Sequence, residues 1–295
     1  MTEQADWDIV TGVGLTALAV AAGRAIETRR PDRLVDDPYA ESFVQAGQPP
    51  VPMPTRPGDD GDSAIPWKSM ATYMGVRSKF FDDFFAAAAE AGIRQVVLFA
   101  AGLDCRAPRL DWPSGTTVYE LDAPRVLDFK EEVLDSREAR ARCERRTVAC
   151  DLREDWPAAL RKADFDPDQP TAWLAEGLLP FLPDEAKGTL LSRMADLSAP
   201  GSWIAAEHLD GSTEDELKND PSFHAMSNEL GIDMDELWPA GQNLDVAGWL
   251  STHGWSVTTS TAVELSSRYE RPFDDAFVRP MRSSRLITAQ AARDI

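Results

Sequence analysis

The chain has 295 residues, with 30 Lys and Arg against 50 Asp and Glu, so its formal net charge is −20. This charge argues against nucleic acid and against an anionic membrane surface as partners, because both require clustered basic residues. No apolar run is long enough to span a bilayer, and the acidic N-terminus lacks the apolar core of a signal peptide. We therefore expect a cytoplasmic globular protein with no nucleic-acid or membrane partner.

The three cysteines, Cys105, Cys143 and Cys150, are odd in number and lack the paired spacing of metal ligands. Such a set predicts neither a disulfide framework nor a zinc site. We expect no bound metal.

The sequence pattern over residues 1–92 predicts an N-terminal helical lid region. Apolar residues at helical spacing indicate one helix over 13–26, and a second is expected over 69–91. Between them, residues 45–66 contain six prolines and three glycines, which predicts a long loop. A loop of this length is either a functional lid or a disordered connector, and the sequence leaves both readings open.

From residue 93 the pattern changes to alternating strands and helices, which is typical of a parallel sheet with helices on both faces. Right-handed crossovers bring the carboxyl ends of such strands to one edge, where ligands bind. We expect this core over 93–206, a mainly helical cap insertion over 207–250, and closing strands over 251–295. The expected strands are 95–101, 116–121, 146–150, 171–175, 202–206, 255–260 and 286–290, and the helices of the core are 124–136, 156–163 and 183–197.

The loop after the first strand carries the first candidate binding residue. It contains the single glycine Gly102 and the acidic Asp104, so it is not the GxGxxG turn that packs against a pyrophosphate. Because Asp104 would repel a phosphate, a cofactor with a cationic centre and no phosphate fits better. S-adenosylmethionine, with its sulfonium, ammonium, carboxylate and adenosine, has that character. The alternative is that Gly102 only ends the strand.

Acidic residues also end the next three strands. Asp122 lies 20 residues after the glycine, about the spacing at which an acid accepts hydrogen bonds from ribose hydroxyls. Glu120 points to the same side of its strand and could support it. Asp151, with the N–H of Leu152, fits the edge of an adenine, unless Asp151 is only a helix cap. Glu176 would face a cationic ligand, because burying an unpaired carboxylate is costly.

Several segments in a fixed order carry a resemblance to a known family. They are residues 7–11, 37–40, Arg77 with 80–82, 101–106, 120–124, 151–152 and 176–179. Together they resemble the leucine carboxyl methyltransferase-like family, and within it the bacterial branch of S-adenosylmethionine-dependent O-methyltransferases. The resemblance runs from about residue 6 to the C-terminus and rests on the order and spacing of the segments. The Pro-rich loop over 45–66 does not map onto it.

The resemblance implies an α/β fold of the class I methyltransferase type: a Rossmann-like, mostly parallel sheet of seven strands whose last strand is antiparallel. It implies S-adenosyl-L-methionine as the cofactor, and it implies roles for individual residues. Arg77 binds the methionine carboxylate, Gly102 packs against the methionine moiety, Asp122 binds the ribose, Asp151 and Leu152 bind the adenine, and Glu176 lies near the methionyl amine. Arg24 is a weaker match to a second carboxylate contact.

Methyl transfer requires the acceptor oxygen to be aligned with the carbon–sulfur bond in a site that excludes water. A carboxylate acceptor needs no base, whereas a hydroxyl benefits from one. The candidate base is His208, which lies just after the fifth expected strand, ahead of His224 and His253. A helix-cap or solvent-facing role is the alternative for His208. Tyr73 is a candidate for the lining of the acceptor site, unless it only packs.

We therefore expect an S-adenosylmethionine-dependent O-methyltransferase that methylates a carboxylate or hydroxyl of a small molecule, such as a polyketide or another secondary metabolite. The alternatives are a protein C-terminal carboxyl methyltransferase and a non-catalytic S-adenosylmethionine-binding interaction protein. A nicotinamide-dependent dehydrogenase is a further alternative. The absence of the second and third glycines of the GxGxxG turn argues against it.

Acidic residues gather in one part of the chain. Residues 207–245 contain eleven Asp and Glu and one lysine, which is half of the net charge. This segment is either a solvated face or the cap of the acceptor pocket. As a cap it would repel an anionic acceptor, so it favours a neutral or cationic one.

Overall fold

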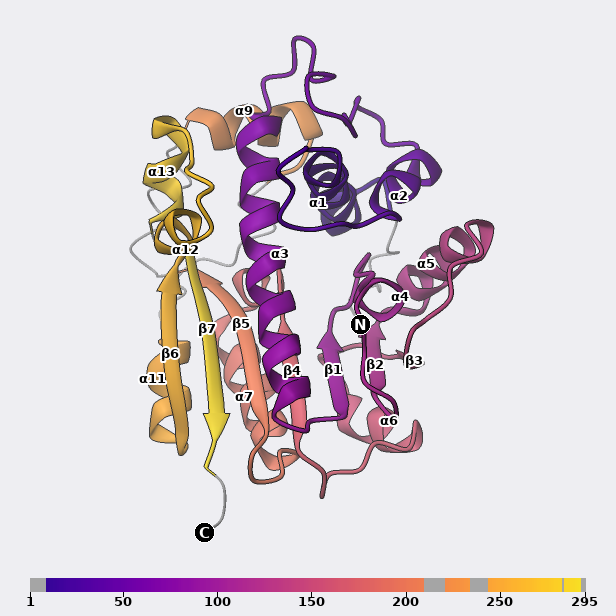
Figure 1. Cartoon of the computed structure of the whole chain (residues 1–295), viewed down its shortest axis with the longest axis vertical. Helices are drawn as coiled ribbons and strands as arrows, with labels where there is room; N and C mark the ends of the chain where they lie inside the picture. Colours follow the sequence, from indigo (N-terminus) through magenta and orange to yellow (C-terminus); the bar gives the residue numbers. More distant parts are fainter. Residues whose placement is uncertain (1–8, 210–220, 234–243, 283, 293–295) are drawn as a thin grey trace.

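The computed structural model describes residues 9–209, 221–233, 244–282 and 284–292. Within these residues, one seven-stranded sheet with the order β3-β2-β1-β4-β5-β7-β6 forms the centre of the molecule (Figure 1). The strands are β1 (Gln95–Phe99), β2 (Thr117–Asp122), β3 (Glu144–Ala149), β4 (Thr171–Ala175), β5 (Trp203–Leu209), β6 (Trp255–Thr261) and β7 (Ser284–Ala291). Only β7 runs antiparallel to its neighbours, so the predicted fold class is confirmed.

The central strands form because both faces of the sheet are covered. All five residues of β1 and all five of β4 are buried, as expected for parallel strands between two helical layers. β3 lies at the edge and is mostly polar, so its apolar pattern does not mark where it begins. This explains why β3 starts at Glu144, two residues before the expected start at 146.

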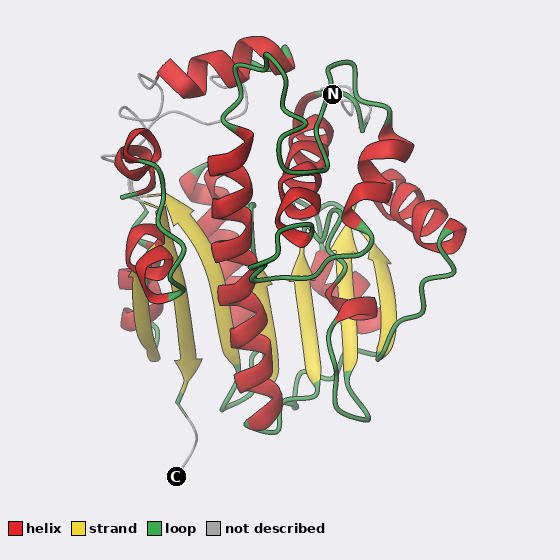
Figure 2. Ribbon diagram, turned by 45° about the horizontal axis from the view of Figure 1, so that its top comes forward, coloured by secondary structure: helices red, strands yellow, loops and turns green. Residues whose placement is uncertain are grey.

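Helices cover both faces of the sheet (Figure 2). One face packs against α6 (Trp156–Lys162), α7 (Asp184–Asp196) and α11 (Val246–Thr252), around Trp156 and Trp173. The other face packs against the long helix α3 (Trp67–Glu90) and α12 (Ala262–Arg268). Three further short segments are α4 (Arg106–Arg109), the 3-10 turn η1 (Leu179–Phe181) and α13 (Asp275–Met281).

A third group of helices lies above the carboxyl edge of the parallel strands, at the top of Figure 1. It consists of α1 (Gly12–Thr28), α2 (Ala40–Gly47), α5 (Pro124–Ser136) and α9 (Pro221–Leu230), and α1 packs on α3 and α2. The Pro-rich loop belongs to this group, because Met53 and Ile65 are buried in its hydrophobic cluster. The loop is therefore packed onto the helical layer.

The boundaries of the expected cap insertion differ from the structure. β5 continues to Leu209, so Glu207 and His208 are part of the sheet and not of the insertion. α11 packs on the sheet through Val246 and Leu250. Residues 210–220 and 234–243 of the expected insertion lie outside the described residues. None of the described helices combines the length and the apolar character that crossing a membrane requires.

Candidate functional site

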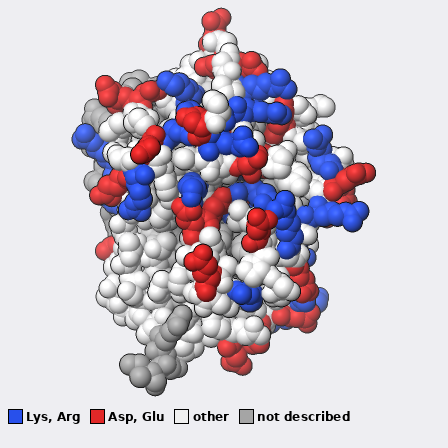
Figure 3. Space-filling model, in the orientation of Figure 1, with Lys and Arg blue, Asp and Glu red and all other residues white. Residues whose placement is uncertain are grey.

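A cavity of about 560 Å³ lies at the carboxyl edge of the parallel strands. Its walls come from the ends of β1, β2, β4 and β5 and from α1, α3, α9 and α13. This is the size range of small-molecule sites and the place where open α/β sheets bind ligands. On the face shown in Figure 3, acidic and basic side chains intermingle over the helical half above this edge.

The loop between β1 and α4 is fixed by one carboxylate. The N–H of Gly102 donates to Asp122 Oδ2 at 2.7 Å, and the N–H of Ala123 donates to Asp122 Oδ1 at 2.7 Å. Gly102 has a φ of +47°, a left-handed conformation that favours glycine. Burial raises the pKa of Asp122, although both N–H bonds oppose that rise. Each carboxylate oxygen keeps another lone pair, so Asp122 can also accept bonds from a vicinal diol.

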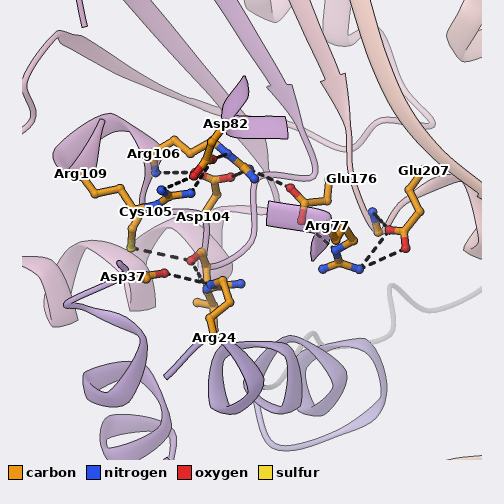
Figure 4. A network of polar contacts seen from close by, with 12 residues as sticks. Arg24, Asp37, Arg77, Asp82, Asp104, Cys105, Arg106, Arg109, Glu176 and Glu207 are labelled. Carbon is orange, nitrogen blue, oxygen red and sulfur yellow. Dashed lines mark hydrogen bonds and ion pairs between the residues drawn. The ribbon is translucent and has the colours of Figure 1, made fainter. Parts of the chain in front are cut away.

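Arg77 on α3 joins two carboxylates from neighbouring strands (Figure 4). Its Nε lies 2.9 Å from Glu176 Oε1, and its Nη1 lies 3.0 Å from Glu207 Oε2. Burial disfavours the charged guanidinium, but Glu207 and Glu176 raise the pKa of Arg77 above its usual value. The three side chains therefore form a buried, charged group in the wall of the cavity.

Arg106 holds Glu176 from its other side. Its Nη1 lies 2.7 Å from Glu176 Oε2, its Nε lies 2.7 Å from Asp82 Oδ1, and it also pairs with Asp104. Asp82 in turn binds Arg109 at 2.6 Å. Burial opposes ionisation of Asp104, but the charges of Arg106, Lys130 and Arg109 and the N–H of Arg106 together outweigh it, and the pKa of Asp104 is lowered to about 2. Such a closed set of pairs fixes the direction of each carboxylate.

Glu207 also connects three elements by hydrogen bonds. Its carboxylate accepts from the hydroxyl of Tyr73 on α3 and, at 2.9 Å, from the N–H of Gly177 after β4. The Tyr73 oxygen lies 2.9 Å from Ser284 Oγ on β7. Burial and the charge of Glu207 raise the pKa of Tyr73 well above its usual value, so Tyr73 is a neutral phenol.

Most of the predicted site residues line this one cavity. Tyr73, Arg77, Gly102, Asp122 and Glu176 do so, and so does Arg24. Arg24 is held by Asp37 at 2.9 Å and by the carbonyl of Leu103 at 2.8 Å. The roles predicted for these residues remain predictions, but they are neighbours as those roles require.

His208 does not line the cavity. On β5 it alternates with Glu207, which does, so the two side chains leave opposite faces of the sheet. Ile204 and Ala206, on the side of His208, pack in the cluster that contains α7 and α11. The expectation that His208 follows the strand on the catalytic edge was wrong, because β5 ends three residues later than predicted, at Leu209. His224 and His253 do not line the cavity either.

Asp151 and Leu152 also lie outside the cavity lining. The Asp151 carboxylate is occupied by Arg153, which donates its backbone N–H at 2.8 Å and its guanidinium. The loop is nevertheless close to the ribose candidate, because the N–H of Cys150 donates to the carbonyl of Asp122 at 3.0 Å. The adenine-binding role of the pair stays a prediction.

Glu207 and Arg106 are site residues that the sequence reasoning missed. Glu207 was counted with the insertion, although a glutamate directly after an apolar strand is the pattern that had singled out Glu176. The sequence shows Arg106 only as one residue of the segment 101–106. Its partners come from α3, the loop after β1 and the end of β4, which no local spacing predicts.

The outer half of the cavity is apolar. It is lined by side chains from α1, α3, α9, α13, η1, the Pro-rich loop and the end of β5: Ala17, Val20, Ile65, Pro66, Met70, Met74, Phe181, Leu209, Met226, Leu230, Phe277 and Met281. The Pro-rich loop and α9 are joined there, because Ser63 Oγ and the N–H of Ala64 donate to Glu229 at 2.6 and 2.7 Å. One cavity thus combines a charged inner half with an apolar outer half.

Comparison with known proteins identifies the family of the chain. The leucine carboxyl methyltransferase family model matches residues 17–195. A protein from Saccharopolyspora erythraea, named as an S-adenosyl-L-methionine-dependent methyltransferase, is 48% identical over 290 residues, covering 98% of this chain and 99% of its own. A protein of the same description from Rhodococcus jostii is 47% identical over 278 residues, covering 93% of each.

A solved structure shows the same fold at low identity. The crystal structure of a DUF574 family protein from Streptomyces avermitilis superposes with a TM-score of 0.56 at 14% identity, covering 92% of this chain and 96% of its own. The family model and the close relatives settle membership by sequence. The chain belongs to the leucine carboxyl methyltransferase family.

Proposed function

We propose that the chain transfers the methyl group of S-adenosyl-L-methionine to a carboxylate or hydroxyl oxygen of a small molecule, such as a polyketide or another secondary metabolite. As a member of its family, with close relatives named for S-adenosyl-L-methionine, it is an S-adenosyl-L-methionine-dependent methyltransferase. The choice of an oxygen atom and of a small molecule goes beyond that membership and is supported by the cavity.

The observation that carries the proposal is the division of one cavity into two chemically different halves. The inner half contains Arg77, Gly102, Asp122 and Glu176 at the strand ends. The outer half is apolar and continuous with it. A charged cofactor and an apolar acceptor therefore fit side by side, with the reacting atoms at the boundary.

The residues of the inner half fit the charges of the cofactor. Asp122 keeps a free lone pair on each oxygen for the ribose hydroxyls, while Gly102 brings its backbone to the cavity surface. The carboxylates of Glu176 and Glu207 are suitable counter-charges for the sulfonium and the ammonium. Arg77 between them is the partner for the methionine carboxylate.

The bound cofactor would supply an electrophilic methyl group on a sulfonium. The chain's own contribution is to hold the reactants and to exclude water. The Arg77–Glu176–Arg106 pairs keep the inner carboxylates in fixed directions, so little reorganisation is needed when a cation binds. The apolar residues of α1, α3 and α9 remove water from the acceptor oxygen and restrict its approach.

The proposal is tested by calorimetry followed by a turnover assay. We expect one S-adenosyl-L-methionine per chain at micromolar affinity, and release of S-adenosylhomocysteine with small apolar acceptors. Absence of cofactor binding would refute the proposal. Turnover only with peptides that end in a free carboxylate would favour a protein carboxyl methyltransferase. Binding without transfer to any acceptor class would favour a non-catalytic cofactor-binding protein.

A further inference from the structure

Every cationic side chain in the described lining of the cavity is already paired. These side chains are Arg24, Arg77, Arg106 and Arg109, and each has a carboxylate oxygen within 3 Å. The same lining contains five carboxylates: Asp37, Asp104, Asp122, Glu176 and Glu207. Asp82, outside the lining, also binds Arg106 and Arg109, so six carboxylates face four arginines, an excess of two negative charges. S-adenosyl-L-methionine carries a net charge of +1. These side chains therefore keep an excess of negative charge when the cofactor is bound, before any acceptor enters.

An anionic acceptor would gain little in this cavity. Its carboxylate would leave water for a wall of methionine, phenylalanine and leucine side chains. Of the four arginines in the described lining, Arg77 is assigned to the methionine carboxylate of the cofactor, and each of the other three has a carboxylate within 3 Å. Burying such a charge without a partner is strongly unfavourable. A neutral apolar molecule avoids this cost.

Tyr73 and Glu207 lie where the two halves of the cavity meet. On α3, Tyr73 is one turn from Arg77 toward the helix N-terminus, and the apolar Met70 is the next lining residue in that direction. On β5, Glu207 is followed on the same face by the apolar Leu209. The Tyr73 hydroxyl donates to Glu207, so a carboxylate stands behind the phenol at this boundary.

From this arrangement we propose that the acceptor is a neutral, apolar alcohol or phenol, and that Tyr73 and Glu207 relay its proton. The inference rests on the proposed function and names its acceptor class. The acceptor oxygen forms a bond to the methyl carbon while the donor sulfur keeps the electron pair of the bond that breaks. The acceptor proton passes to the Tyr73 oxygen, and the Tyr73 proton passes to Glu207.

Tyr73 acts in this relay as a neutral phenol and not as a phenolate base. It is buried, with 7% of its surface exposed, and the charge of Glu207 opposes its ionisation. Its oxygen already has Glu207 as acceptor and Ser284 as neighbour, which fixes its direction. The proton that it accepts must therefore be matched by one that it donates, and Glu207 is the carboxylate within reach.

Matched pairs of acceptors test the substrate class. The probes are 2-naphthol with 2-naphthoic acid and 4-tert-butylphenol with 4-tert-butylbenzoic acid. We expect each phenol to bind the protein at least about tenfold more tightly than its acid in calorimetry, with or without the cofactor. Equal or tighter binding of the acids, or no binding of the phenols, overturns the assignment of a neutral acceptor.

Variants test the relay separately. In both Tyr73→Phe and Glu207→Gln, kcat for the phenols should fall by about 100-fold or more. In Tyr73→Phe, the Kd for the phenols should change by less than about threefold. Tyr269→Phe is the matched control, because it removes a tyrosine–carboxylate bond of 3.1 Å to Asp83 outside the cavity lining. Phenol binding without turnover in the wild type, or full kcat in Tyr73→Phe, overturns the relay. Methylation of the acids alone would overturn the inference and leave the proposed function standing, whereas failure to bind S-adenosyl-L-methionine would remove both.

Discussion

Asp122 shows how one side chain links the fold to the proposed chemistry. Its two oxygens accept the N–H groups of Gly102 and Ala123, which determines the shape of the loop after β1. The same oxygens line the cavity and keep lone pairs for a diol. The carboxylate therefore has to be present and correctly directed before any cofactor binds.

Replacement of Asp122 by asparagine should weaken cofactor binding. The amide has only one acceptor oxygen, and its NH2 group faces a backbone N–H wherever it points. Loss of a hydrogen bond to a charged group costs about 1.5–3 kcal/mol, so we expect the Kd for S-adenosyl-L-methionine to rise about 10- to 100-fold. Isothermal titration calorimetry measures this change. The control is Asp111→Asn, whose carboxylate is 93% exposed and outside the cavity lining; an unchanged Kd in Asp122→Asn would refute the ribose assignment.

The affinity for the cofactor should also depend on pH through Asp122. Burial raises the pKa of this carboxyl against the effect of its two N–H bonds, while the charge of Lys130 lowers the pKa and that of Glu120 raises it. Binding that needs the carboxylate is complete above this raised pKa and is lost as the pH falls through it. We expect the Kd in the wild type to rise between pH 7 and pH 4.5. In Asp122→Asn the rise should be smaller, and equal slopes for the two proteins would contradict the assignment.

At the scale of elements, the sequence predicted what depends on local patterns. β4 and α5 have the predicted bounds, because a buried apolar run and a helix that starts at a proline are local signals. The end of β5 was missed, because Glu207 and His208 look like the start of a polar loop. Which acids pair with Arg77 and Arg106 depends on how α3 lies against the sheet, and that is set by packing over long separations.

The contact between α1 and α3 depends on a glycine. A Cβ on Gly75 would lie 2.7 Å from Cδ of the buried Glu27, which is tied to Arg271 at 3.0 Å and to the N–H of Leu34 at 2.7 Å. Glu27 cannot move without losing these bonds. The side chain of Glu27 on α1 therefore leaves room only for glycine at position 75 of α3.

We expect Gly75→Ala to lower the free energy of unfolding by about 1–2 kcal/mol, since overpacking costs more than the gain in helix propensity returns. The matched control is Gly188→Ala in α7, where no atom lies within 4 Å of the added Cβ. That substitution should raise the free energy of unfolding by about 0.5–1 kcal/mol. Urea unfolding of both variants measures the difference, and equal effects at the two positions would show that Glu27 does not restrict α3.

For the whole molecule, charge acts in two different ways. The paired arginines and carboxylates of the cavity are buried, with Arg106 only 2% exposed, so salt screens them weakly. The excess of acidic side chains lies elsewhere, and a net charge of −20 on 295 residues favours expansion of the chain. Exposed ion pairs oppose this only slightly, at about 0–1 kcal/mol each.

Salt should therefore stabilise this protein. Raising NaCl from 0.05 to 0.5 M shortens the range of repulsion between exposed carboxylates, and a gain of about 1 kcal/mol corresponds to a Tm increase of about 2–4 °C. Differential scanning calorimetry measures it. The triple variant Asp59→Asn, Asp60→Asn, Asp62→Asn removes three exposed charges from the Pro-rich loop, so its Tm should start higher and rise less. A Tm that falls with added NaCl would mean that attractive pairs, and not net repulsion, dominate the electrostatic free energy of the fold.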